Sequence, residues 1–411
     1  MNFQSTRAAG LDRLSAFLPH AGRDYANTRN FDDGAPTSGA RSNVSQLSPW
    51  LHSGLITETE VVETVLGSHS PDAAEKYIAE VFWRVYFKGY LEQRPTIWTA
   101  YKEGRDAALL AKGDNAGFAK AYNEATEGRT GIAAFDHWAR ELVETGYLHN
   151  HARMWFASIW IFTLRLDWQL GADFFLRHLI DGDAASNTLS WRWIGGLHTK
   201  GKTYLARADN IARYTANQPG GALDAQGLAQ VAVPLEEAQE HQRRPLGLTS
   251  QPASAEFDEP YALMLHDEAA SHVSLTLARP PALVIAAARP DARSSGSTGE
   301  LARGFAAGAV SGSAAEAAKA YGCGPVHWTE GTALSNIMNE AGLTRIAVPY
   351  LPVGWTRDAL MPELAPLMDA GQVTTMLGDL DRATWPLAKA GFFGVKKKIE
   401  AVLGEIRVAV G

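Results

Sequence analysis

The sequence predicts an all-helical domain followed by an α/β domain with a parallel sheet. Apolar residues recur with helical periodicity through residues 1–217, whereas short apolar runs alternate with helical segments over residues 260–411. Between them, residues 218–259 are rich in Pro, Gly, Gln and Ala, which is typical of a linker. A length of 411 residues gives room for two or three domains.

The first part contains four segments in which apolar residues recur every three to four positions. Pro71 marks the start of the first segment, with Asp72 as the expected capping residue. The helices are expected at 72–92, 132–146, 148–165 and 168–180. Few runs here alternate with period two, so no sheet is expected. The linker is expected to form one short helix at 235–242.

The second part alternates short apolar runs with helical segments, the pattern of a parallel sheet covered by helices. Strands are expected at 261–265, 282–287, 344–350 and 373–377. Helices are expected at about 299–321, 331–342, 357–370 and 385–404. The Gly- and Ala-rich stretch 303–315 lacks GxGxxG and a P-loop lysine, so it predicts a closely packed helix rather than a nucleotide-binding loop.

Composition limits the function classes. Hydrophobic residues make up 46% and charged residues 20% of the chain, as in ordinary globular proteins. The formal net charge is −7, and residues 221–411 hold 15 basic against 21 acidic side chains. A protein that coats polyanions is therefore disfavoured, and an anionic partner is expected to meet the first half. The longest apolar run, 154–164, is too short for a membrane span and no secretory signal is seen, so a cytoplasmic protein is expected.

Cysteine and tryptophan usage limits the kinds of site that the chain can form. The single cysteine, Cys323, excludes an internal disulfide, a structural zinc site and an iron–sulfur cluster, because each needs more ligands. We expect Cys323 to be a small buried residue. Nine of the twelve tryptophans lie before residue 194, which indicates either a helical core rich in large side chains or an electron path.

Charged and aromatic residues share one face of the helix expected at 72–92. Glu80, Trp83 and Arg84 are spaced i, i+3 and i+4. They indicate either a binding site or a solvated Glu80–Arg84 pair beside core aromatics. A second group, Ser42, Ser45 and Ser48 before a proline, indicates either a capped helix start or a phosphate-binding turn.

A further candidate site joins the helix after residue 148 to the turn IDGD at 180–183. Arg153 lies in an apolar segment, and a buried arginine needs an anion. Asp181 and Asp183 are the best candidates in the sequence, because the glycine between them permits a tight turn. A metal could use the same carboxylates, but no nearby histidine cluster completes a site, so no metal is expected.

Six ordered motifs in residues 25–215 resemble the FAD-binding helical domain of the photolyase/cryptochrome family. They are YANTRNF, VSQLSPWLHSGLIT, EVFWR, TGYLHNHARMWFAS, DW at 167–168 and LIDGDAASNTLSWRW. Residues 29–49 are most similar to the bacterial iron–sulfur branch, whose cluster needs four cysteines, so no cluster is expected here. The family usually places an antenna domain first, and residues 260–411 look like that domain moved behind the helical one. Whether an antenna pigment binds stays open.

The resemblance implies an all-helical FAD-binding domain that holds a U-shaped FAD. Arg153 and Asp181 would pair against the flavin ring, and Asn187 would lie beside flavin N5. The implied cofactor-binding residues are Tyr25, Ser45, Gln46, Leu47, Ser48, Arg84, Asn150, Arg153, Asp181, Asp183 and Asn187. Trp191 and Trp168 match two members of the family's electron-transfer chain. The third is missing near residue 115, and the alternatives are Trp98, Trp155, Trp160 and Tyr122.

The resemblance also implies the activity. Light would excite reduced FAD, and an electron would pass to a cyclobutane pyrimidine dimer, split its ring and return. The residues that match the lesion pocket of repair members are Glu80, Trp83, Asn150, Met154 and Trp193. Arg29 and Arg207 are the expected DNA contacts, and UV-damaged DNA is the expected partner of a monomer. The alternatives are a cryptochrome-like blue-light photoreceptor, favoured by the overall acidity, and a flavin-binding remnant with a structural role.

Overall fold

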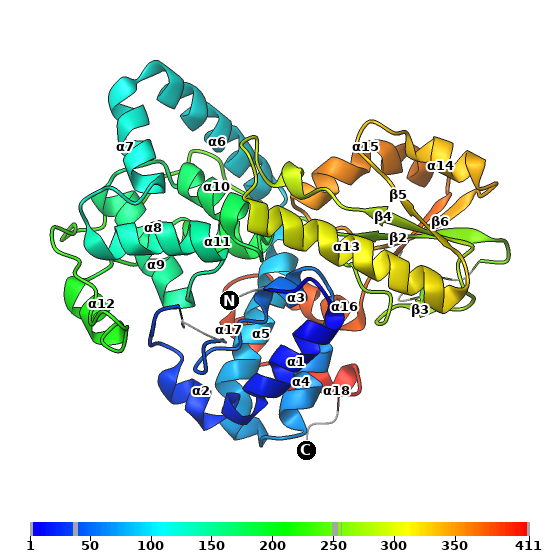
Figure 1. Cartoon of the computed structure of the whole chain (residues 1–411), viewed down its shortest axis with the longest axis horizontal. Helices are drawn as coiled ribbons and strands as arrows, with labels where there is room; N and C mark the ends of the chain where they lie inside the picture. The colour runs from blue at the N-terminus through cyan, green and yellow to red at the C-terminus, as the bar shows by residue number, and fades with distance from the viewer. Residues whose placement is uncertain (1–2, 36–39, 249–253, 256, 409–411) are drawn as a thin grey trace.

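The computed structural model describes residues 3–35, 40–248, 254–255 and 257–408. A helical part and a parallel sheet flanked by helices lie side by side (Figure 1). The predicted fold class is therefore confirmed. Within the described residues, no helix is long and apolar enough to cross a lipid bilayer.

The helical part contains helices at the four predicted positions and further helices that were not predicted, of which the longest covers Thr96–Asp114. Its elements are α1 (Arg7–Phe17), η1 (Leu18–His20), α2 (Arg23–Thr28), α3 (Ser48–His52), α4 (Glu58–Leu66), α5 (Pro71–Glu92), α6 (Thr96–Asp114), α7 (Ala116–Thr126), α8 (Ala133–Thr145), α9 (Asn150–Ser158), the π-helical η2 (Ile159–Thr163), α10 (Trp168–His178), α11 (Ala184–Ile194) and α12 (Ala208–Tyr214). The N-cap of α5 is Ser70 rather than Asp72, because the Ser70 hydroxyl accepts from the Ala73 amide.

The sheet is parallel and has the order β5-β4-β2-β6-β7. Its strands are β2 (Tyr261–His266), β4 (Leu283–Ala287), β5 (Gly324–His327), β6 (Arg345–Pro349) and β7 (Val373–Met376), beside a short pair, β1 (Ser254–Ala255) and β3 (Thr276–Leu277). The four predicted strands are confirmed. The edge strand β5 was not predicted, because its residues are mostly exposed and form no apolar run. The chain runs from β2 through β4 to β5 on one side and then crosses to β6 on the other side of β2. The carboxyl ends of β2 and β6 therefore form the switch point of the sheet.

The remaining elements are η4 (Pro290–Arg293), α13 (Glu300–Tyr321), α14 (Leu334–Glu340), α15 (Trp355–Asp369), α16 (Asp379–Thr384), η5 (Trp385–Leu387), α17 (Phe393–Lys396) and α18 (Ile399–Glu405). The single helix predicted at 385–404 is wrong, because Pro386 and Gly391, which lies in the following turn, break it into short pieces. Cys323 follows the end of α13 and is partly exposed rather than buried.

The helix predicted at 235–242 is also wrong. This stretch runs as extended chain over the helical part, where the Leu235 amide donates to the Gly195 carbonyl. The Glu237 carboxylate accepts two hydrogen bonds from Arg192, at 2.7 and 2.6 Å. Tertiary contacts therefore replace the local hydrogen bonds that a helix of this length would need.

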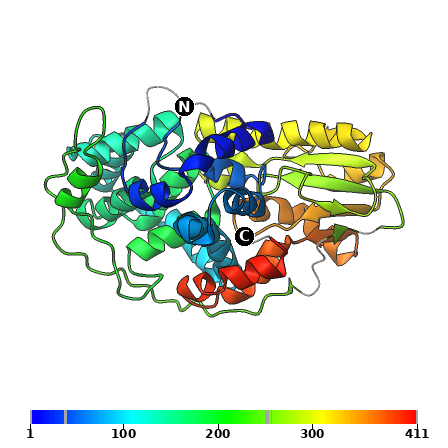
Figure 2. The same cartoon turned by 90° about the horizontal axis from the view of Figure 1, so that it is seen from below.

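A hydrophobic core crosses the boundary between the two parts. Phe82 and Tyr86 of α5 belong to the same buried cluster as Leu263 of β2 and Trp385 of η5. Helix α5 also carries Gly89, where an added Cβ would lie 2.7 Å from the indole of Trp385. The chain after α16 is packed along α5, as Figure 2 shows from below. Helix α5 is thus covered by both ends of the sequence.

Candidate functional site

The turn between α10 and α11 gathers groups from three parts of the chain. Asp183 caps α11, because its Oδ1 accepts from the Ser186 amide at 2.6 Å. Gly182 is enclosed, since an added Cβ would lie 2.6 Å from Nη1 of Arg293. The indole of Trp355 donates to the Gly182 carbonyl at 2.8 Å. The α/β part therefore fixes a turn that belongs to the helical part.

The ion pair expected between Arg153 and Asp181 is present. Nη2 of Arg153 lies 3.0 Å from Oδ2 of Asp181, and its Nε donates to the Leu148 carbonyl. Burial by itself would raise the pKa of Asp181, but the neighbouring Arg153 and Ser48 lower it below the ordinary value. The carboxylate stays ionised, and its buried Oδ1 has no hydrogen-bond partner among the described residues. The pair therefore has an acceptor left for a ligand.

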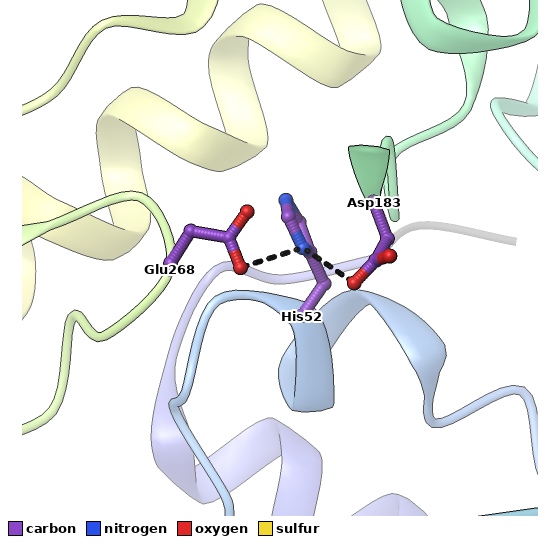
Figure 3. A group of neighbouring side chains, drawn as sticks. All are labelled: His52, Asp183 and Glu268. Carbon is purple, nitrogen blue, oxygen red and sulfur yellow. Dashed lines mark ion pairs between the residues drawn. The ribbon is translucent and has the colours of Figure 1, made fainter. Parts of the chain in front are cut away.

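A second charged cluster extends from Asp183 to the α/β part (Figure 3). Nη2 of Arg84 lies 3.0 Å from Oδ2 of Asp183, and Nζ of Lys88 lies 2.8 Å from Oε2 of Glu268. The ring of His52 is placed between the two carboxylates, with Nδ1 at 3.6 and 3.8 Å from their oxygens. Glu268 follows the carboxyl end of β2, so this cluster ties the switch point of the sheet to the candidate site.

His52, Asp183 and Glu268 could also be considered as metal ligands, because their ligand atoms lie within 4.8 Å of one another. The two carboxylates already face Arg84 and Lys88, which supply positive charge at the oxygens a metal would use. Burial opposes ionisation of Asp183, yet Arg84 and the other nearby cations hold its pKa far below the ordinary value. The positive charges of Arg84 and Lys88 therefore already offset the negative charges of Asp183 and Glu268.

The loop predicted to hold phosphates precedes α3. The Arg13 guanidinium donates to the Ser45 and Val44 carbonyls at 2.6 and 2.7 Å, which fixes the loop. Gln46 has a left-handed φ of 54°, and its side-chain oxygen accepts from the Arg41 amide. Gln46 and Leu47 are buried, whereas Ser45 and Ser48 are half-buried.

Tyr25 lies on α2, and Arg29 directly follows this helix. The Tyr25 ring is buried edge-on against Tyr77, with centroids 5.1 Å apart. Arg29 pairs with Glu80 of α5. Arg84 points instead to Asp183 and Glu58, so the alternative of a solvated Glu80–Arg84 pair is wrong.

The residues predicted for a lesion pocket lie on α5, α9 and α11. The Trp83 ring is stacked on Phe392, with centroids 4.0 Å apart and planes at 19°. Trp193 is stacked on Tyr204 at 5.8 Å. Asn150 is exposed at the start of α9, and Met154 is half-buried one turn later. The structure thus supplies Phe392 as a neighbour of Trp83 that the sequence did not predict.

Trp191 and Trp168, the two predicted relay residues, belong to two separate aromatic routes. Trp191 lies 6.2 Å from Trp160, which in turn lies 6.1 Å from Tyr122. Trp168 lies 5.8 Å from Tyr101, which is stacked on Trp98 at 5.0 Å. Of the four alternatives for the missing relay, Trp98 and Tyr122 end these two routes. Trp155 is stacked on Trp138 instead.

The remaining predicted residues are Asn187 and Arg207. Nδ2 of Asn187 donates to the Ala172 carbonyl at 2.8 Å, which leaves its Oδ1 to accept from a ligand. Arg207 is exposed and pairs with Asp209 at 2.5 Å. Arg207 therefore lies on the surface, as a DNA contact requires.

The groups at this site fit a flavin in chemical terms. Within the part of the chain that the structure describes, one oxygen of the ionised Asp181 and the Trp191 indole N–H are buried without a partner, and a polar, aromatic cofactor could use both groups. Two cavities, of 280 and 450 Å³, lie elsewhere. The smaller lies beside Phe31 and Asn217, and the larger lies between Trp98 and Arg357.

Sequence comparisons agree with the geometry of the helical part. Residues 77–223 match the family model of the FAD binding domain of DNA photolyase. Deoxyribodipyrimidine photo-lyase from Vibrio cholerae is 29% identical over 230 residues, 54% of this chain and 45% of that protein. The protein of the same name from Streptomyces griseus is 32% identical over 180 residues, 41% of this chain and 38% of that protein.

Solved structures of similar proteins include a bacterial class III photolyase from Agrobacterium tumefaciens and a cryptochrome from Synechocystis. They are 26% and 27% identical, cover 51% and 52% of this chain and 42% and 44% of their own, and both have a TM-score of 0.42. The stretch that the family model matches is similar, in its class, to a flavin-binding domain. The match is to the FAD binding domain of DNA photolyase, so the resemblance seen in the sequence is confirmed. The chain spans less than half the length of these relatives.

Sequence reasoning missed four neighbours of the candidate site: Lys88, Glu268, Arg293 and Trp355. Lys88 lies one helical turn after Arg84 on α5, so helical spacing could have indicated it. The other three reach the candidate site from parts of the chain that no periodic pattern connects with it. One signal existed for Glu268, because charged residues directly after a buried strand lie at the ligand-binding edge of a parallel sheet.

Proposed function

We propose that this protein repairs cyclobutane pyrimidine dimers in DNA with light, using FAD. The observation that carries the proposal is the match of residues 77–223 to the FAD-binding domain of DNA photolyase. The ion pairs Arg153–Asp181 and Arg84–Asp183 support it, because they bring α5, α9 and α11 together at one turn.

When bound, reduced FAD supplies the light-excited electron that opens the cyclobutane ring and takes the electron back. Asp181 and Asn187 each offer one acceptor oxygen to orient the cofactor. Trp83 and Trp193 offer apolar surfaces to a dimer that has left the duplex. Glu80 can exchange its pairing with Arg29 for a hydrogen bond to the pyrimidine edge, which frees the guanidinium for a phosphate.

The test is illumination of the chemically reduced, full-length protein with an oligonucleotide that contains one thymine dimer. The expected result is restored thymines in the light and none in a dark sample of the same preparation. Protein that contains FAD but restores no thymines would favour the photoreceptor alternative, which the net charge of −7 also favours. Protein that binds no FAD would reject both functions.

A further inference from the structure

The chain from residue 385 to residue 398, the α5-covering segment, is fixed along α5. The Tyr86 hydroxyl donates to the Ala390 carbonyl at 2.8 Å. Nε2 of Gln93 donates to the carbonyls of Trp385 and Ala388, at 2.8 and 3.1 Å. This segment follows the last strand of the sheet, so the α/β part covers the helix that carries Trp83.

The segment reaches the predicted lesion pocket through Phe392. Its side chain is 5% exposed and stacks on Trp83 with nearly parallel planes. A stacked neighbour fixes the indole and occupies one of its faces. A residue outside the helical part thus contacts Trp83, one of the residues predicted to line the lesion pocket.

The next residue is turned the opposite way. Phe393 is 74% exposed, although a large aromatic side chain gains from burial. Four lysines lie within the ten residues 389–398, which contain no acidic residue, in a half of the chain that is otherwise acidic. Of these four lysines, only Lys396 forms an ion pair with a described residue: its Nζ lies 2.8 Å from Oε1 of Glu75. Lys389, Lys397 and Lys398 are exposed.

We propose that the α5-covering segment is a DNA-binding surface, on which a strand next to the flipped dimer stacks a base on Phe393 and places its phosphates near Lys397 and Lys398. An exposed aromatic ring among unpaired cations is the combination that binds single-stranded nucleic acid. The inference rests on the proposed function. It locates part of the DNA surface in the acidic half of the chain, where composition alone predicts none.

The test compares full-length variants for binding to a duplex with one thymine dimer, over a range of salt concentrations. Phe393→Ala should weaken binding about 5- to 150-fold, the loss expected for one stacked base. The matched control is Leu110→Ala on α6, because Leu110 is also 74% exposed. The double variant Lys397→Ala, Lys398→Ala should make the association constant for DNA less dependent on salt. The steepness of log K against log salt concentration should fall by about 0.9 for each phosphate that the variant no longer neutralises. Its control is Lys319→Ala, an exposed lysine of α13.

All the altered side chains are exposed, so the variants should unfold at the parent temperature and retain the parent content of FAD. If the parent binds dimer DNA and the Phe393 and lysine variants bind it with the same affinity and salt slope, the surface is refuted while the proposed function stands. If the parent shows no preference for dimer DNA, both fall. Unchanged DNA binding, combined with loss of binding to phosphatidylserine vesicles, would assign the segment to a lipid surface instead.

Discussion

Replacing Trp355 by phenylalanine tests whether the α/β part supports the flavin site. The Trp355 indole is 1% exposed and donates to the Gly182 carbonyl between Asp181 and Asp183. Phenylalanine keeps an aromatic ring but has no donor, so the carbonyl would be buried without a partner. The turn would then lose the hydrogen bond that fixes it from the α/β side.

The expected loss follows from this geometry. A buried carbonyl left without its hydrogen bond costs about 1–3 kcal/mol. The smaller ring adds about 1 kcal/mol for poorer packing. At roughly 2–4 °C per kcal/mol, the melting temperature should fall by about 5–15 °C. Because the turn carries both aspartates, the variant should also purify with less FAD than the parent.

The assay combines thermal unfolding by circular dichroism with FAD content per mole of protein. The control is Trp328→Phe, because the Trp328 indole is also buried and donates to the Thr332 carbonyl at 2.7 Å, but within the α/β part. The control should lose stability and keep its FAD. If both variants lose FAD equally, or if Trp355→Phe retains parent stability and FAD, the support role is wrong.

Three further predictions concern other residues. Glu80→Ala should lower the repair quantum yield by a factor equivalent to about 2–4 kcal/mol at matched FAD occupancy; an unchanged yield would leave Glu80 only the structural pairing with Arg29. Trp191→Phe should stop photoreduction of oxidised flavin while sparing repair by chemically reduced protein, and equal photoreduction rates would reject it as the relay. Burial raises the pKa of Asp267 to about 6, so the folded state holds this proton more tightly and loses stability as pH rises from about 4 to 6. The free energy of unfolding of Asp267→Asn, measured with urea, should therefore rise relative to that of the parent by up to about 3 kcal/mol between about pH 4 and pH 6. A difference between variant and parent that does not change with pH would contradict this prediction.

Much of the fold could be predicted because its signals are local. The strands β2, β4, β6 and β7 are apolar runs, and α5 combines a proline start with regular apolar spacing. The edge strand β5 has no such run, since one side of it meets solvent. The broken helix after residue 385 follows the surface of α5, and no sequence period reports a contact with a helix so distant in the chain.

The candidate site likewise combines residues that could be predicted from the sequence with residues that could not. An aspartate partner for Arg153 could be predicted from the sequence, because a buried charge requires a counterion, and the family resemblance selected Asp181 over Asp183. The partner of Glu80 could not, since Arg84 at i+4 is the local choice and Arg29 becomes available only through tertiary packing. Phe392 was missed for a related reason: its stacking on Trp83 depends on where the last strand of the sheet delivers the chain.

The coverage of α5 by residues 385–398 has a consequence for how the protein is made. The ribosome releases α5 long before it releases the segment that covers it. Until then the nascent chain presents Trp83 and Tyr86 to solvent and to chaperones. The helical part therefore cannot complete its fold before the α/β part is synthesised, although domains usually fold one after another during synthesis. A product that terminates before residue 385 would keep this aromatic face open, which makes it a substrate for proteolysis and quality control.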